Sequence, residues 1–169
     1  MAIYFQNSFR FFLALFVQLL IINWVDFGSA SSYMYPLFYV IFIVLLPLSI
    51  PHPLLILLAF LQGITIDIFM STGGLHASSL VTLALLRPYI LRFIAPREDF
   101  DVNRPINSKY IGFRRFVTYL SLCILIQHFW FFSVEFFKIT ELHIILWKTI
   151  ANGFFTLLLI LVYDFISQK

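Results

Sequence analysis

Ionisable side chains are scarce in this sequence, so each one that interrupts an apolar stretch is a candidate for chemistry. Asp67 is the clearest case, because it follows Ala59 and Gly63 at helical spacing within an otherwise apolar segment. A charged side chain at the centre of a bilayer costs about 2.5–3.5 kcal/mol, and small residues let a neighbouring backbone approach closely. The spacing therefore predicts that Asp67 is buried against protein. Two interpretations stay open: a proton, ion or switching site, or a carboxylate that caps the turn at 71–74 or pairs with an Arg or His on another helix.

A histidine opens the next apolar segment. His76 follows Gly73 and Gly74, and helical spacing places it on one face with Ser79 and Arg87. The sequence has four histidines, and none stands three or four residues from another, as a zinc site on a helix would require. We therefore expect His76 to form hydrogen bonds, and we expect no metal or cofactor.

Polar residues also recur along two later segments. The first set has heptad spacing, which places its members on one helix face: Arg114, Ser121, His128 and Glu135. The second set falls within about a quarter of a helix circumference: Lys148, Asn152, Thr156 and Tyr163. We expect the two stripes to face each other. Hydrogen bonds between the helices and a cavity for a substrate are both consistent with this pattern.

The motifs of common enzyme classes are missing from the sequence. It has no glycine-rich phosphate loop, no Gly-x-Ser-x-Gly and no His-Glu-x-x-His. Asp26, Asp67 and Asp164 stand in separate segments, so paired aspartates are not predicted, and the single Cys123 lies in an apolar run. We expect no catalytic residues.

The elements that position these residues follow from composition. The chain has 169 residues, of which 62% are hydrophobic and 11% are charged, whereas soluble domains carry about 25% charged residues. Six apolar segments are separated by residues typical of turns: 9–27, 33–50, 54–70, 75–95, 115–137 and 142–166. Lipid leaves free backbone groups unsatisfied, and segments of this length and continuous apolarity favour helices over barrel strands. The sequence predicts a single all-α domain, a polytopic transmembrane bundle of about six helices.

The charges predict an orientation for this bundle. Seven of the eleven Lys and Arg residues lie in or beside the connection at 96–112. Cytoplasmic loops hold the excess of Lys and Arg, so this basic connection and both termini are expected inside, with membrane lipids as contacts. Clustering in one loop argues against nucleic acid as the partner. A cleaved signal peptide is disfavoured, because its basic n-region would contain only Arg10, and Asn23 and Asp26 interrupt what would be its apolar region.

Several short motifs, taken in order, resemble a known family. They are Tyr35-Pro36-Leu37-Phe38, Leu45-Leu46-Pro47, the run from Gly63 to Phe69 that contains Asp67, Thr72-Gly73-Gly74-Leu75-His76-Ala77, and Arg87-Pro88. This combination resembles the rod shape-determining protein MreD family, in the version found in Bacteroidota.

The resemblance implies a non-enzymatic role in the bacterial inner membrane. Members bind the bitopic protein MreC and help to couple cytoplasmic MreB filaments to the enzymes of peptidoglycan synthesis. The structural or partner-binding candidates are then Gly63, Asp67, Gly73, Gly74, His76 and Arg87.

Two other function classes stay open. The substrate-binding subunit of an energy-coupling-factor transporter is a six-helix protein of similar size, possibly of similar fold, and would use the two polar stripes to hold a vitamin or metal. A membrane enzyme acting on lipid-linked substrates would use Asp67 and His76, with Arg87 as a phosphate clamp.

Overall fold

The computed structural model describes residues 2–21, 35–94 and 106–167, and these residues contain helices and no strand. The prediction of an all-α fold is therefore confirmed for the described part of the chain. Its elements in order are α1 (Ala2–Phe16), a π-helical turn (Val17–Ile21), α2 (Val40–Leu45), α3 (His52–Met70), α4 (Leu75–Ile94), α5 (Ser108–Ile111), α6 (Phe113–Phe136), a 3-10 turn (Ile139–Glu141) and α7 (Leu142–Ser167).

Four of these helices, α3, α4, α6 and α7, are long and apolar enough to cross a membrane, and residues 7–21 form a shorter apolar helix. Large apolar side chains point outward from them, such as Phe93 at 86% and Phe69 at 72% exposure. Such an apolar surface is stable in contact with lipid and would be unfavourable in water. The chain is a membrane protein: four of its described helices could span a membrane, and the count of about six stays a prediction for the chain as a whole.

The expected helix at 33–50 is wrong over its described residues. Only Val40–Leu45 is α-helical there. Pro36 and Pro47 bracket this helix, and each proline lacks an N–H donor and disfavours helical backbone in the residue before it. Leu46 accordingly has an extended backbone, with φ −59° and ψ 144°. We call residues 35–46 the central segment.

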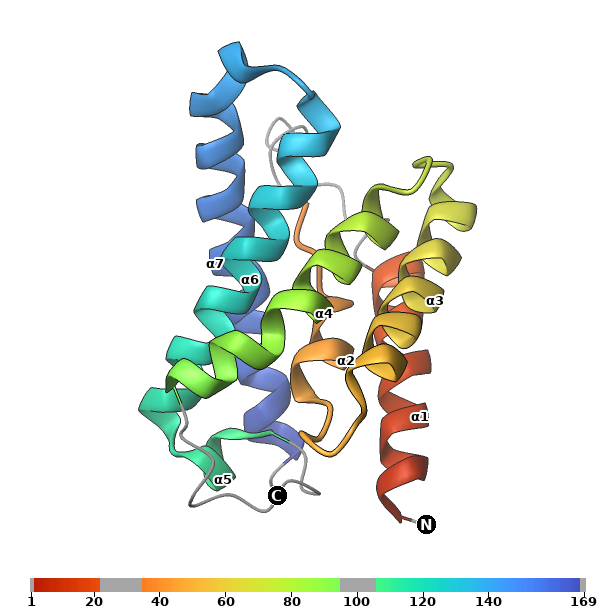
Figure 1. Cartoon of the computed structure of the whole chain (residues 1–169), viewed down its shortest axis with the longest axis vertical. Helices are drawn as coiled ribbons and strands as arrows, with labels where there is room; N and C mark the ends of the chain where they lie inside the picture. Colours follow the sequence, from red (N-terminus) through yellow and green to blue (C-terminus); the bar gives the residue numbers. More distant parts are fainter. Residues whose placement is uncertain (1, 22–34, 95–105, 168–169) are drawn as a thin grey trace.

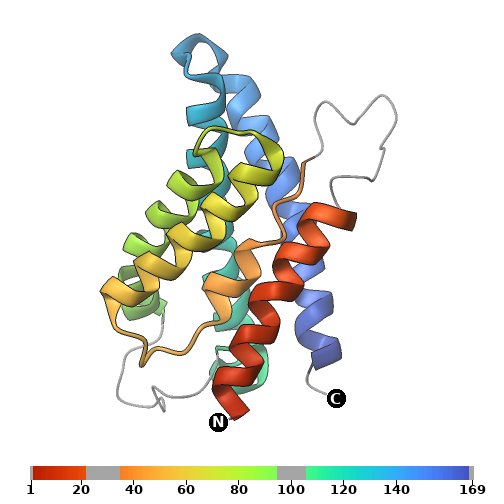
Figure 2. The same cartoon turned by 90° about the vertical axis from the view of Figure 1, so that its right-hand side faces the viewer.

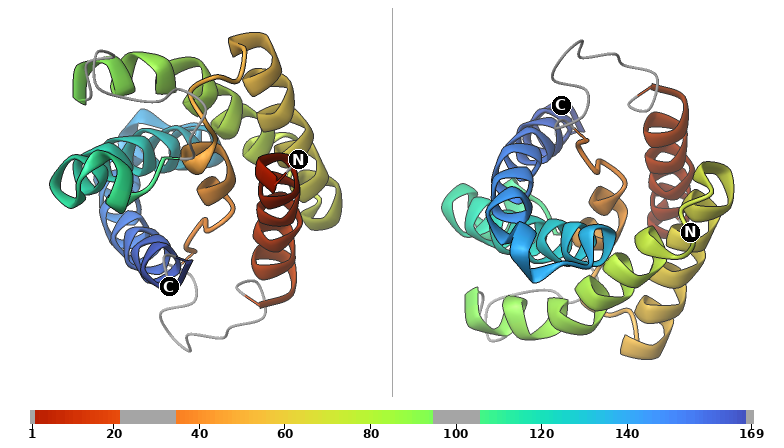
Figure 3. Two further views of the ribbon diagram at one scale, coloured as in Figure 1. Left: turned by 90° about the horizontal axis from the view of Figure 1, so that it is seen from below. Right: turned by 90° about the horizontal axis from the view of Figure 1, so that it is seen from above.

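The central segment fills the middle of the bundle. Every residue from 37 to 46 is at most 6% exposed. Figure 3, which looks along the bundle, shows α2 and the chain before it enclosed by α1, α3, α4, α6 and α7. Non-helical backbone is tolerated at membrane depth only where protein surrounds it, and this position provides that surrounding.

The helices run between two ends of the molecule. Both termini and α5 lie at the lower end in Figure 1, while the α3–α4 and α6–α7 turns lie at the upper part. Figure 2 shows α3 and α4 side by side, with α1 passing beside the central segment. Termini at the same end are what the predicted topology requires.

The other segments differ from the predicted ranges in detail. Helices α3, α4, α6 and α7 begin and end within two residues of them. Helix α1 begins at Ala2, seven residues before the range 9–27, and gives way to the π-helical turn after Phe16; residues 22–27 lie outside the described part. Part of the connection at 96–112 is helical, since it contains α5, and residues 96–105 are also outside the described part.

Candidate functional site

The carboxylate of Asp67 joins α3 to the start of α4. Its Oδ1 accepts hydrogen bonds from the Thr72 hydroxyl at 2.5 Å and from the His76 backbone N–H at 3.0 Å, and its Oδ2 accepts from the Ala77 N–H at 2.9 Å. The first N–H groups of a helix have no partner within the helix, and the helix dipole favours an anion there. Asp67, 4% exposed, thus caps α4 from the neighbouring helix. Of the two interpretations of Asp67, capping describes this geometry.

Direct backbone contact between α3 and α4 makes this cap possible. A Cβ atom added to Gly63 would lie 2.3 Å from Ala77 Cα and 2.6 Å from Ala77 N. The helices therefore touch at a position where only glycine fits. Ala59, one turn earlier, is fully buried, so the small-then-acidic face that the spacing predicted is the face that packs.

The turn between α3 and α4 uses left-handed backbone. Ser71, Gly73 and Gly74 have φ values of 55°, 61° and 98°. Glycine adopts such values without steric cost, which accounts for the glycine pair. The N–H groups of Ser71 and Thr72 both donate to the Asp67 carbonyl. Asp67 therefore holds the turn with its backbone as well as its side chain.

His76 faces inward and bonds to the central segment. Its Nδ1 lies 2.8 Å from the Tyr39 hydroxyl, which also accepts a hydrogen bond from Gln127 Nε2 at 3.0 Å. The tautomer of His76 decides which of the two groups donates in this contact. The imidazole also lies beside Phe131, with the two ring centres 4.9 Å apart.

Arg87 and Tyr119 bind the lower end of the central segment. Arg87 donates from Nη2 to the Leu46 carbonyl and from Nε to the Tyr119 hydroxyl, the latter at 2.8 Å. The Tyr119 hydroxyl donates in turn to the Val44 carbonyl at 2.9 Å. Both carbonyls belong to the last residues of α2 and its C-cap, where no further helical turn supplies a donor. Arg87, 2% exposed, replaces the missing turn.

The upper end of the central segment is bound by Asn152 and Thr156, members of the predicted polar stripe on α7. Asn152 Oδ1 accepts from the Tyr35 N–H, and Thr156 Oγ1 accepts from the Leu37 N–H at 3.1 Å. His128 links the stripes, since its Nε2 lies 3.1 Å from Thr156 Oγ1. Its Nδ1 donates to a carbonyl of its own helix, so Nε2 accepts the threonine proton. The stripes face each other here through a hydrogen bond between α6 and α7.

The candidate residues thus form two groups, one in the α3–α4 hairpin and one, described above, at the upper end of the central segment. Gly63, Asp67, Gly73, Gly74 and His76 meet in the α3–α4 hairpin. Arg87 does not join them, because the eleven residues that separate it from His76 along α4 span roughly 16 Å. The phosphate clamp that we considered for a membrane enzyme is therefore not assembled.

Five of the eight members of the polar stripes take other positions, among them Glu135, Ser121 and Lys148. Glu135 is exposed and Ser121 half-buried on α6. Lys148 lies over the ring of Phe136, with its Nζ 4.8 Å from the ring centre. These three residues extend the predicted stripes beyond the part that contacts the central segment.

Sequence reasoning missed the residues at the centre of this network: Tyr39, Tyr119 and Gln127, all fully buried. The tyrosines read as part of the apolar pattern, and Gln127 stood beside the more conspicuous His128. The available signal was the hydrogen-bonding capacity of each side chain within a segment otherwise free of polar groups.

Among the residues that the structure describes, no group of three His, Cys, Asp or Glu side chains could hold a metal ion. No protein-family model, curated protein or solved structure matches the chain. The fold and site define an α-helical membrane protein whose buried polar side chains bind its own interrupted central segment.

Proposed function

We propose that the protein is a non-enzymatic component of the bacterial cell-elongation machinery in the inner membrane, as its resemblance to the MreD family implies. The observation that carries the proposal is the α3–α4 hairpin. Gly63, Asp67, the glycine pair and His76 supply the most specific part of the resemblance, and they form one interlocked unit. A motif that builds a rigid hairpin suits a scaffold on which a partner docks.

The partner in this proposal is a single-pass protein like MreC, which links the chain to MreB filaments and wall-synthesis enzymes. Ile68 and Phe69 lie beside the Asp67 cap and are each 72% exposed. They give the hairpin an apolar outer face at membrane depth. A transmembrane helix of the partner could pack there through van der Waals contact, the main attraction available between helices in lipid.

The transporter alternative has less support. A substrate-binding subunit needs interior polar groups that are available to its cargo. Asn152, Thr156 and Arg87 instead bind the backbone of residues 35, 37 and 46. These contacts favour a scaffold.

A pull-down of the tagged full-length protein from its native host, in mild detergent and with mass spectrometry, tests the proposal. We expect a bitopic coiled-coil protein, an actin-like ATPase or wall-synthesis enzymes among the partners. Recovery of ABC-type ATPases with a second polytopic subunit would overturn the proposal and support the transporter.

A matched pair of variants sharpens this experiment. Phe69→Ala removes an exposed ring beside the hairpin turn, and Phe93→Ala removes one that is 86% exposed near the opposite end of α4. We expect Phe69→Ala to reduce recovery of the bitopic partner and Phe93→Ala to leave it unchanged. Equal recovery with both variants would exclude Phe69 from the docking surface.

A further inference from the structure

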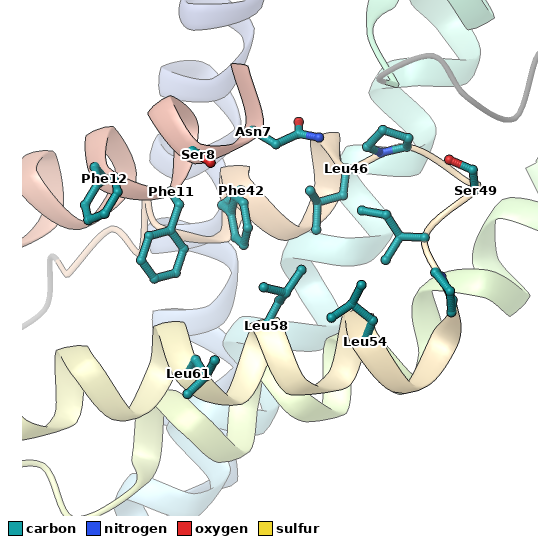
Figure 4. A pocket seen from close by; sticks show the side chains of 13 residues that line it. Asn7, Ser8, Phe11, Phe12, Phe42, Leu46, Ser49, Leu54, Leu58 and Leu61 are labelled. Carbon is teal, nitrogen blue, oxygen red and sulfur yellow. The ribbon is translucent and has the colours of Figure 1, made fainter. Parts of the chain in front are cut away.

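A groove of about 500 Å³ lies between α1 and α3, away from the α3–α4 contact. Phe11 and Phe12 of α1 form one wall, Leu54, Leu58 and Leu61 of α3 form the other, and Phe42 of α2 lies at its base (Figure 4). Because α1 and α3 are both lipid-facing helices, the groove opens towards the hydrocarbon. Its walls are mainly apolar.

Three polar residues line the groove: Asn7, Ser8 and Ser49. Ser49 lies at the end near Leu54, Asn7 lies above Leu46 and Ser8 lies beside Phe11, while Phe12 and Leu61 mark the other end (Figure 4). The Oδ1 atom of Asn7 is buried there without a hydrogen-bond partner among the described residues. An occupant that matches the groove therefore has a long apolar part and a polar group at one end.

The lining of the groove favours a slender occupant. Leu54 and Leu61 are seven residues apart on α3, which is roughly 10 Å. Helices that associate in lipid prefer small residues at the contact, whereas these walls carry Phe and Leu. An acyl chain suits such a lining.

The charges at the polar end favour an anionic head group. The described charged residues at the end of the molecule with the termini and α5 (Figure 1) are mainly basic, although none lines the groove: Arg10, Arg92, Lys109, Arg114 and Arg115. Arg10 stands one turn along α1 from Asn7, and its Nε donates to the Tyr163 hydroxyl of α7 at 3.4 Å. Helix α3 begins at the same end without a side-chain cap, so its dipole adds positive potential there. Basic residues at the membrane surface attract anionic lipids.

We propose that the α1–α3 groove binds one acyl chain of an anionic phospholipid, with the head group at the end lined by Asn7 and Ser49. This site is additional to the proposed partner-docking function and does not depend on it. A bound chain would fill the space between α1 and α3 and hold α1 against the bundle.

Native mass spectrometry of the full-length protein, titrated with dioleoyl phosphatidylglycerol and with dioleoyl phosphatidylcholine, tests the site. Leu58→Trp fills the groove, and Leu57→Trp is the matched control, since Leu57 is 50% exposed on α3 and does not line the groove. We expect one phosphatidylglycerol to bind more tightly than phosphatidylcholine. We expect Leu58→Trp to weaken it about tenfold, as the loss of roughly two buried methylene groups would, and Leu57→Trp to have no effect.

Equal affinities for the two variants would overturn the site, and equal affinities for the two lipids would overturn its preference for anionic lipid. Because Leu58→Trp is a core-side change, a second test uses the photo-crosslinking residue p-benzoylphenylalanine in cells, at the 46% exposed groove residue Leu61, with Leu57 as control. A phospholipid adduct specific to position 61 supports the proposal. An adduct with a second copy of the chain or with another protein overturns it.

Discussion

Replacing Gly63 with Ala probes the contact on which the hairpin depends. The added Cβ would lie 2.3 Å from Ala77 Cα, 2.6 Å from Ala77 N and 2.8 Å from the His76 carbonyl carbon. Carbon atoms pack at about 3.5–4.0 Å, so α3 and α4 would have to separate by roughly 1 Å. All three obstructing atoms are backbone, so no side-chain rotation relieves the clash.

The same separation would stretch the Asp67 cap. Its bonds to the N–H groups of His76 and Ala77 are 3.0 and 2.9 Å long and would lengthen beyond good hydrogen-bond geometry. Overpacking costs about 1–3 kcal/mol, and a hydrogen bond to a charged group contributes about 1.5–3 kcal/mol. The overpacking cost together with partial loss of the two hydrogen bonds predicts a destabilisation of roughly 2–5 kcal/mol. For a chain of this size that corresponds to a melting temperature lower by about 5–15 °C.

The assay is thermal melting of the detergent-solubilised protein followed by gel filtration, with Gly153→Ala as the control. A Cβ at Gly153 has as its nearest neighbour the Ile124 Cγ2 atom at 3.4 Å, which is close to ordinary van der Waals contact. Replacing a glycine inside a helix by alanine gains about 1 kcal/mol, so this variant should melt at the wild-type temperature or slightly above. If Gly63→Ala melted together with Gly153→Ala, the close approach of α3 and α4 would be refuted.

Three further predictions use the same melting assay. Asp67→Asn keeps one acceptor oxygen but loses the charge and the second acceptor, so it should cost about 1–3 kcal/mol; a wild-type melting temperature would contradict the capping role. Arg87→Lys should melt below the wild-type temperature, because an ammonium cannot reproduce the two directed bonds of the guanidinium. A wild-type melting temperature for this variant would show that the positive charge alone suffices. Thr156→Val leaves the Leu37 N–H without its acceptor and should cost about 1–3 kcal/mol. The control Thr65→Val loses only a bond within its own helix and should be close to neutral. Equal melting temperatures for the two variants would show that Thr156 does not support the central segment.

Helical periodicity and apolarity were enough to predict most of the fold. They predicted an all-α protein, and the long segments that became α3, α4, α6 and α7. The spacing of Ala59, Gly63 and Asp67 also predicted which face of α3 packs. These features depend on residues close together in the sequence, so local patterns contain them.

The central segment could not be predicted in the same way. Its residues are apolar throughout, so hydropathy treated them as another spanning helix, and two prolines were insufficient evidence against this. What stabilises the interrupted backbone is a set of donors and acceptors from four other helices, including Gln62, Tyr119 and Asn152. Their pairing with particular carbonyl and N–H groups depends on the tertiary arrangement. The sequence showed that polar groups were present, but not that their partners were backbone atoms.

This pairing determines which residues can inform on function. In lipid, an unsatisfied backbone group costs several kcal/mol, so each side chain that binds the central segment or caps α4 is already required for folding. Substitutions at Asp67, Arg87 or Thr156 would therefore lower activity by lowering the amount of folded protein, and loss of a phenotype at these positions would not identify a binding site. Lipid-facing residues such as Phe69 are free of that requirement. A variant there that folds at the wild-type temperature and still loses its partner would identify a docking surface, which no variant of the buried network can do.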